Sequence, residues 1–332
     1  MLRLPWFEHR TPGTVAEAAK ILAGEGPGAM LVAGGTDLLP NMKRKHQTPK
    51  VLVSLKGVSS LKGFSNGIFG AGLTLREVVE NESTPAALRQ AAAQVATPQL
   101  RNMATLGGNL CLDTRCTYYN QNYEWRQAIG FCLKKDGQIC WVATASKRCV
   151  AVSSTDTAPA LIALNANVVL SGASGEREIP VESLYKNDGI DYLTRRPDEI
   201  LTAVKVPAGW QSTYWKLRRR GSFDFPILGV AVALRLDSDS SIQEARIALG
   251  AAASRPFLVE KASEYLKGRK LTDEVIAEAS ALIANRAKPM DNTDMDLYWR
   301  KEVADDFAGY ALRELRGDDM RMTRLRIARH LV

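Results

Sequence analysis

Five cysteines occur in this chain of 332 residues, and all five lie between Cys111 and Cys149. Thiolates are soft ligands, and four of them suit a zinc ion or an iron–sulfur cluster. Cys116, Cys132, Cys140 and Cys149 follow one another at separations of 16, 8 and 9 residues. The close cysteine pairs of zinc ribbons are missing from this pattern, yet the spacing alone leaves zinc and a [4Fe–4S] cluster equally open.

Structural disulfides fit this segment poorly. The N-terminal residues carry no apolar h-region and no small-residue cleavage site, so we expect a cytoplasmic protein with reduced thiols. Aromatic residues surround the cysteines, and an apolar shell of this kind limits solvent access to a metal centre. The same residues would equally suit a small local core: Tyr118, Tyr119, Tyr123, Trp125, Phe131 and Trp141.

Two glycine-containing loops have the composition of phosphate-binding loops. Gly34 and Gly35 follow an apolar run at 30–33 that predicts a strand, and Thr105 to Asn109 form the second loop. Glycine permits close approach and unusual dihedral angles, so such loops can present backbone N–H groups to an anion. Neither loop matches the dinucleotide-binding or P-loop fingerprint, and one Gly-Gly pair alone is usually an ordinary turn. Two loops together favour a pyrophosphate held from two sides.

Hydrophobic periodicity predicts an α+β protein in which strands are followed by helices. The expected domains are residues 1–55, 56–207 and 208–332. No run of eighteen apolar residues occurs, which excludes a transmembrane helix. We expect strands at 30–33, 51–55, 67–73, 168–171, 200–206, 227–236 and 242–250, a hairpin turn at 172–178, helices capped by Thr14, Thr74, Thr84 and Thr272, a helix at 157–164 and a last helix at 297–315.

The chain carries 44 basic and 36 acidic residues, a net charge of +8, and three histidines. The scarcity of histidine argues against catalytic triads and His-rich metal sites. A basic chain can bind nucleic acid, anionic lipid or an acidic protein. No nucleic-acid-binding module accompanies the basic residues, which favours a solvated or partner-facing surface.

The two glycine loops carry a family resemblance. Ala33-Gly34-Gly35-Thr36-Asp37-Leu38-Leu39 and Ala104-Thr105-Leu106-Gly107-Gly108-Asn109 resemble the flavin-binding loops of the FAD-binding medium subunits of molybdenum hydroxylases, the xanthine dehydrogenase and carbon monoxide dehydrogenase group. The resemblance covers nearly the whole chain. It implies a two-subdomain FAD-binding domain of the PCMH type and a C-terminal α+β domain of antiparallel strands and helices.

The resemblance also implies which residues contact FAD. Outside the loops, Asp156, Leu201 and Lys216 match family contacts, and given the loops this interpretation is favoured over a helix N-cap, a core leucine and a surface lysine. The implied set is Ala33, Gly34, Gly35, Thr36, Asp37, Thr105, Gly107, Gly108, Asn109, Asp156, Leu201 and Lys216.

About forty residues, 112–150, stand where the family loop runs almost directly into the aspartate-containing helix. The run from Cys111 to Gln121, with the later cysteines, resembles the β subunits of 4-hydroxybenzoyl-CoA reductases, whose insertion carries a [4Fe–4S] cluster. The resemblance implies four ligands and leaves Cys111, beside the flavin loop, as a buried thiol. The implied ligands are Cys116, Cys132, Cys140 and Cys149.

The resemblance implies an electron-transfer oxidoreductase subunit, without catalytic residues of its own, in a dimer of heterotrimers. Its partners are a large subunit with a molybdenum cofactor and a small subunit with [2Fe–2S] clusters. Electrons from ferredoxin would pass through [4Fe–4S], FAD and [2Fe–2S] to molybdenum, for reductive dehydroxylation to benzoyl-CoA. Two alternatives stay open: the flavin subunit of another molybdenum hydroxylase that oxidises a heteroaromatic or aldehyde, and a zinc-stabilised flavin-binding scaffold protein.

Basic residues near the cysteines suggest a docking surface for an acidic ferredoxin. A solvated loop surface explains the same residues equally well: Arg115, Arg126, Lys134, Lys135, Lys147 and Arg148.

Overall fold

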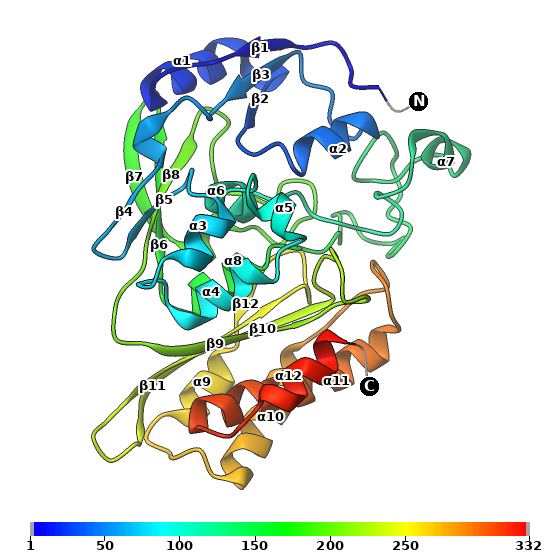
Figure 1. The fold of residues 1–332 in the computed structure, drawn as a ribbon. Helices are drawn as coiled ribbons and strands as arrows, with labels where there is room; N and C mark the ends of the chain where they lie inside the picture. Colours follow the sequence, from blue (N-terminus) through cyan, green and yellow to red (C-terminus); the bar gives the residue numbers. More distant parts are fainter. Residues whose placement is uncertain (1–2, 330–332) are drawn as a thin grey trace.

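The computed structural model describes residues 3–329, which form three sheets (Figure 1). The first sheet is parallel, with strand order β1–β3–β2. The helix α1 between the first two strands begins at Thr14, whose side chain accepts a hydrogen bond from the Glu17 N–H, and ends at Gly26 with φ of 54°. The elements of this unit are β1 (Glu8–Arg10), α1 (Val15–Glu25), η1 (Gly26–Gly28), β2 (Ala29–Val32), α2 (Leu38–Lys43) and β3 (Val51–Ser54).

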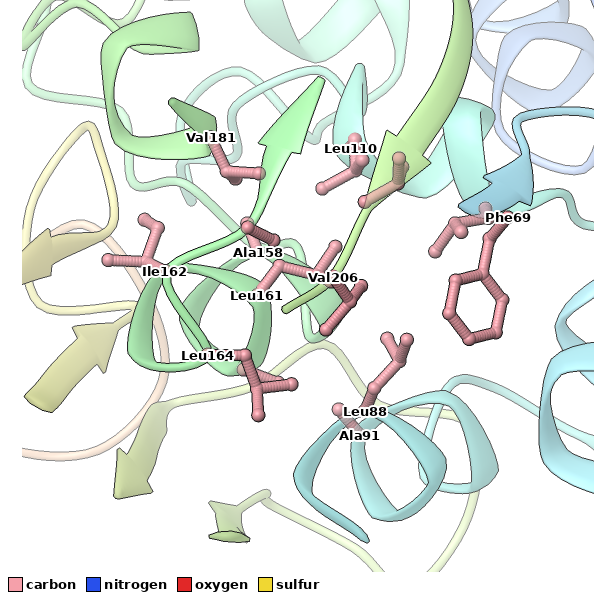
Figure 2. Close-up of a cluster of buried hydrophobic side chains, with 14 of the residues drawn as sticks. Phe69, Leu88, Ala91, Leu110, Ala158, Leu161, Ile162, Leu164, Val181 and Val206 are labelled. Atoms are coloured by element: carbon pink, nitrogen blue, oxygen red, sulfur yellow. The ribbon is translucent and has the colours of Figure 1, made fainter. Parts of the chain in front are cut away.

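The second sheet is antiparallel, in the order β4–β5–β8–β6–β7. Helix α8 is buried along its whole length, because it packs between this sheet and the third one. Figure 2 shows Leu161 of this helix, and Leu164 just after its end, in one core with Leu88 of α4. The elements are η2 (Ser59–Leu61), β4 (Phe64–Ser65), β5 (Ile68–Gly70), α3 (Leu75–Glu80), α4 (Ala86–Ala93), α5 (Pro98–Arg101), α6 (Leu106–Leu110), α8 (Thr157–Ala163), β6 (Asn167–Gly172), β7 (Gly175–Pro180), η3 (Val181–Leu184) and β8 (Ile200–Lys205).

The third sheet is an antiparallel meander of order β12–β11–β10–β9. Helices α4 and α8 lie on one face of it, and α9 and α11 lie on the other with α10 packed against them, so β9 and β10 are buried almost throughout (Figure 1). The elements are β9 (Gln211–Leu217), β10 (Leu228–Leu236), β11 (Ile242–Gly250), β12 (Phe257–Leu258), α9 (Glu260–Leu266), α10 (Asp273–Arg286), α11 (Leu297–Arg316) and α12 (Arg321–Ala328).

The cysteine segment, residues 112–150, extends from the second unit as one long loop. Arg115 and Val152 pair as an isolated antiparallel bridge, with N–H to O distances of 2.8 and 2.7 Å. The chain between them contains the short helix α7 (Tyr123–Ala128) and otherwise turns and bends. It lies beside α2 at one side of the molecule (Figure 1), where the Arg126 side chain donates to the Arg44 carbonyl. The bridge thus holds the two ends of this segment side by side.

Four predicted features differ from the structure. Thr84 does not cap a helix: Pro85 is the N-cap of α4, without a side-chain cap, and the Thr84 hydroxyl donates to the Val78 carbonyl at 2.7 Å. The strand expected at 67–73 is reduced to Ile68–Gly70, because Thr74 already caps α3. The expected turn at 172–178 is shorter, since Gly175 begins strand β7. The helix at 297–315 is not the last one: Gly317 ends α11 in the left-handed region and α12 follows. Within residues 3–329, no helix is both long and apolar enough to cross a bilayer.

Candidate flavin and metal site

The first flavin loop lies directly against the chain that leads into the second. Gly34 has no room for a side chain, because a Cβ there would collide with the Met103 carbonyl. Gly35 has a φ of 69°, in the region that favours glycine. Within residues 3–329, the backbone N–H groups of residues 34–37 donate to no protein acceptor. This loop therefore offers a cradle of free donors for a phosphate.

The second loop does not offer the free backbone N–H groups that the sequence analysis expected. Its backbone donors are already used: Gly107 N–H donates to the Ala71 carbonyl at 2.8 Å and Gly108 N–H to Thr105 Oγ1 at 3.1 Å. A Cβ on Gly107 would lie 2.8 Å from that of Ala71. The glycines of this loop serve close packing, so the expected grip by donor arrays from two sides is reduced to one array, in the first loop.

Asn109 connects the second loop to the predicted aspartate. Its Oδ1 accepts hydrogen bonds from Thr155 Oγ1 at 2.8 Å, Thr157 N–H at 3.2 Å and Thr157 Oγ1 at 2.6 Å. These two threonines flank Asp156 at the start of α8. Asn109 thus fixes the backbone on both sides of the carboxylate.

Asp156 and Lys216 form a buried ion pair, with 3.0 Å between Oδ2 and Nζ. Tyr214 donates to Asp156 Oδ1 at 2.8 Å, and Lys216 also donates to the Gln94 carbonyl at 2.9 Å. Burial raises the pKa of Asp156 and lowers the pKa of Lys216, while the charge of each opposes the shift of the other. The pair joins the second unit to the third sheet. The interpretation of Lys216 as a surface residue is wrong.

Leu201 lies in β8 within the apolar core, where it is 4% exposed. The next residue, Thr202, accepts the Ala71 N–H, and Ala71 in turn accepts the Gly107 N–H. Leu201 therefore lies behind the second loop rather than among its polar groups.

The cysteine segment is tied to the first flavin loop by a charged contact that the sequence analysis missed. Arg115 is paired with Asp37, and its Nη1 donates to Asn41 Oδ1 at 2.9 Å. Asn41 donates to the other oxygen of Asp37 at 2.9 Å. Burial raises the pKa of Asp37, and the charge of Arg115 opposes that rise. The Phe225 ring covers the guanidinium at 4.8 Å.

Four cysteines from distant parts of the cysteine segment line one cavity. Each is between 5% and 8% exposed, and their thiols are not joined in disulfides. Burial raises the pKa of Cys116 to about 11 and of Cys149 to about 12. Cys111 lies outside the cavity and packs on the core of the second unit. The cavity is lined by Cys116, Tyr118, Tyr119, Cys132, Leu133, Lys134, Cys140, Trp141, Val142, Cys149 and Ala151.

These sulfurs do not form a single-ion site. In the described part of the chain, no three Cys, His, Asp or Glu side chains converge closely enough to hold one metal ion.

Half of the basic residues that were expected at the surface of the cysteine segment are buried instead. Arg115 is paired with Asp37, Arg126 is 0% exposed, and the Lys134 side chain is 6% exposed. Lys147 and Arg148 are exposed, and Lys135 is partly so. The sequence could not predict that these three residues are buried, because their hydrogen-bonding partners are 20 or more positions away along the chain.

Comparison with known proteins supports an FAD-binding role for the part of the chain that contains these loops. The family described as FAD binding domain in molybdopterin dehydrogenase matches residues 6–209, and the CO dehydrogenase flavoprotein C-terminal domain matches residues 212–315. The aldehyde oxidoreductase FAD-binding subunit PaoB of Escherichia coli is 31% identical, over 85% of this chain and 93% of that protein. The carbon monoxide dehydrogenase medium chain of Hydrogenophaga pseudoflava is 26% identical, over 93% and 96%.

Solved structures show the same fold. Carbon monoxide dehydrogenase from Hydrogenophaga pseudoflava superposes with a TM-score of 0.77 at 24% identity, over 94% of this chain and 97% of that one. Quinoline 2-oxidoreductase from Pseudomonas putida 86 gives 0.75 at 22% identity, over 95% and 98%. With both family domains matched in order, the chain belongs to the FAD-binding medium subunits of the molybdenum hydroxylases, the family of carbon monoxide dehydrogenase.

Proposed function

We propose that this subunit holds a [4Fe–4S] cluster beside its FAD and transfers electrons in a molybdenum-dependent reductase of the 4-hydroxybenzoyl-CoA reductase type. The observation that carries the proposal is that Cys116, Cys132, Cys140 and Cys149 line one buried cavity. These residues span 34 positions of an excursion whose two ends are paired at Arg115 and Val152. Such an arrangement serves a group that needs four separate sulfurs.

The cavity favours a cluster over zinc. A zinc ion requires its four ligands to meet at one point, with sulfurs about 2.3 Å from the metal. No such convergence occurs among residues 3–329. A four-iron cluster binds each thiolate at a different corner, so its ligands stand farther apart. Apolar groups such as Val142 and Ala151 complete a water-poor wall.

The flavin is held by residues that the structure brings together. The free N–H groups of residues 34–37 would receive the pyrophosphate, and Asn109 would keep the Asp156 region in place behind it. FAD supplies a group that stores one or two electrons, and the protein supplies its orientation and surroundings. Arg115 and Asp37 join this cradle to the start of the cysteine segment, one residue before Cys116.

The proposed substrate chemistry belongs to a partner. We infer a large subunit with molybdenum and a small subunit with [2Fe–2S] clusters, forming a dimer of heterotrimers in which a phenolic hydroxyl is reductively removed to give benzoyl-CoA. The medium chains of carbon monoxide dehydrogenases, to which this chain is similar, are named as chains of larger enzymes.

A low-potential donor such as ferredoxin fits the outer side of the cysteine cavity. Trp141 lines the cavity and is 38% exposed, so the cavity lies one side chain from the surface. Exposed Lys147 and Arg148 lie on the same segment. An acidic donor would be attracted to this side of the subunit.

One alternative is the flavin subunit of a molybdenum hydroxylase that oxidises an aldehyde or heteroaromatic compound. The relatives named for aldehyde, xanthine and nicotinate oxidation favour it. It leaves the cysteine cavity without a role.

Cysteine variants test the proposal. Cys132→Ser in the full-length chain, purified without oxygen, should lose the iron and retain FAD, because the flavin loops lie outside the cavity. Cys111→Ser is the matched control and should retain both. Iron bound to Cys132→Ser at the wild-type level would overturn the ligand assignment.

A further inference from the structure

A lysine side chain forms part of the wall of the cysteine cavity. Lys134 follows Cys132 by two residues, and its side chain is 6% exposed. Its ammonium group donates to Asp113 Oδ1 at 2.8 Å, to Thr114 Oγ1 at 2.8 Å and to the Gly189 carbonyl. An ammonium has three N–H donors, so all of them are used and the charge is fixed in place.

The partner of this lysine faces away from the cysteines. Asp113 does not line the cavity, and its other oxygen accepts from Tyr119 Oη at 2.9 Å and Gln47 Nε2 at 3.2 Å. The negative charge of Asp113 adds to the raised pKa of Asp37 in the first flavin loop. Lys134 lines the cysteine cavity and Asp113 does not, so the cationic residue of the ion pair is the one on the cysteine side, while the charge of Asp113 acts on Asp37 in the first flavin loop.

This orientation bears on any redox centre held by the four sulfurs. Reduction adds a negative charge to a centre that thiolates have already made negative. A fixed cation in a buried wall stabilises the reduced form more than the oxidised form, and a fixed anion does the opposite. Lys134 lines the cavity whereas Asp113 does not, so the effect of the cation should exceed that of the carboxylate.

Resting on the proposed [4Fe–4S] function, we infer that Lys134 sets the reduction potential of that centre by holding a permanent positive charge in the cavity wall. Asp113 keeps the charge in place and opposes it from the flavin side. The role differs from packing, although the ammonium also lies 4.7 Å from the Tyr119 ring and 5.5 Å from that of Tyr192.

The experiment is a redox titration followed by EPR on the anaerobic holoenzyme. Lys134→Met should lower the cluster potential by an amount equal to at least a tenfold change in the one-electron equilibrium, about 59 mV. Asp113→Asn should raise it, and Lys134→Arg should stay near the wild type. Lys135→Met is the matched control, because the neighbouring lysine is paired with Asp136 at the surface and solvent screens its charge.

Opposite signs for Lys134→Met and Asp113→Asn identify a charge effect, since a purely structural role would move both variants the same way. If Lys134→Met fails to hold a cluster, the rise in Asp113→Asn still decides the question. Equal shifts in Lys134→Met and Lys135→Met, or no rise in Asp113→Asn, would overturn the inference and leave the cluster proposal intact. A wild-type enzyme without a cluster signal overturns the cluster proposal itself.

Discussion

Arg115 and Asp37, 78 positions apart, form an ion pair in which the arginine is 4% exposed and the aspartate 28%. One residue follows the first flavin glycines and the other precedes the first proposed cluster ligand. The pair is therefore the direct contact between the flavin cradle and the cysteine segment.

Removing this contact should weaken flavin binding and folding together. Arg115→Met leaves Asp37 partly buried without its cation, which should cost roughly 2 kcal/mol, less than for a fully buried pair because Asp37 retains some solvent contact. The free energy of unfolding in urea and the FAD content after gel filtration would measure both effects. Arg148→Met, an exposed arginine of the same segment, is the control. Wild-type values for Arg115→Met would show that the contact is dispensable.

Gly34 should tolerate no side chain. In Gly34→Ala the new Cβ collides with the Met103 carbonyl, so the two flavin loops must separate. We expect loss of FAD and a destabilisation of about 1–3 kcal/mol. Gly24→Ala is the matched control: it lies in α1 with open space around its Cβ and should stabilise the helix by about 0.5–1 kcal/mol. Thermal unfolding with and without added FAD separates the two effects, and an unchanged FAD content in Gly34→Ala would contradict the role of the loop.

The buried ion pair should matter far more than a surface pair of the same type. Lys216→Met leaves the buried carboxylate of Asp156 without its cationic partner, which should lower the free energy of unfolding by about 3–5 kcal/mol. Lys205→Met removes an exposed pair with Glu178 and should change stability little. Chemical denaturation compares the two variants directly. Similar losses would contradict the importance given to burial.

His46 should make stability depend on pH. Burial, helped by the charge of Arg126, lowers its pKa from 6.5 to about 4. Between pH 4 and pH 6.5 His46 is therefore protonated in the unfolded chain but neutral in the folded chain. The contribution of His46 to the free energy of unfolding is thus greatest above pH 6.5 and decreases as the pH falls. The loss between pH 7 and pH 5 should be about 1–2 kcal/mol. His46→Phe keeps a ring stacked on Tyr119 and should flatten that dependence in denaturation experiments; an unaltered slope would refute the assignment.

Electron transfer from an acidic donor should slow steeply with added salt, because the exposed basic residues of the cysteine segment attract it through long-range charge. Stopped-flow reduction of FAD by ferredoxin at increasing ionic strength would measure this. Lys147→Gln should lower the rate at low salt and reduce the salt dependence. A rate indifferent to salt would contradict docking at this surface.

The sequence predicted the flavin loops and the four cysteines because each depends on residue type and local order. It did not predict that Arg115 and Lys134 are buried, since a charged residue is buried only where the fold brings a partner such as Asp37 or Asp113 to it. The second loop was misjudged for a similar reason. Two of its N–H groups donate to the carbonyls of Leu73 and Ala71, whose positions follow from the packing of the second sheet.

The central claim is that the insertion holds a four-iron cluster, and metal analysis with EPR of the full-length chain tests it most directly. After anaerobic purification and reduction, we predict about four irons per FAD and the signal of a fast-relaxing cluster. One zinc per chain, with no such signal, would contradict the account.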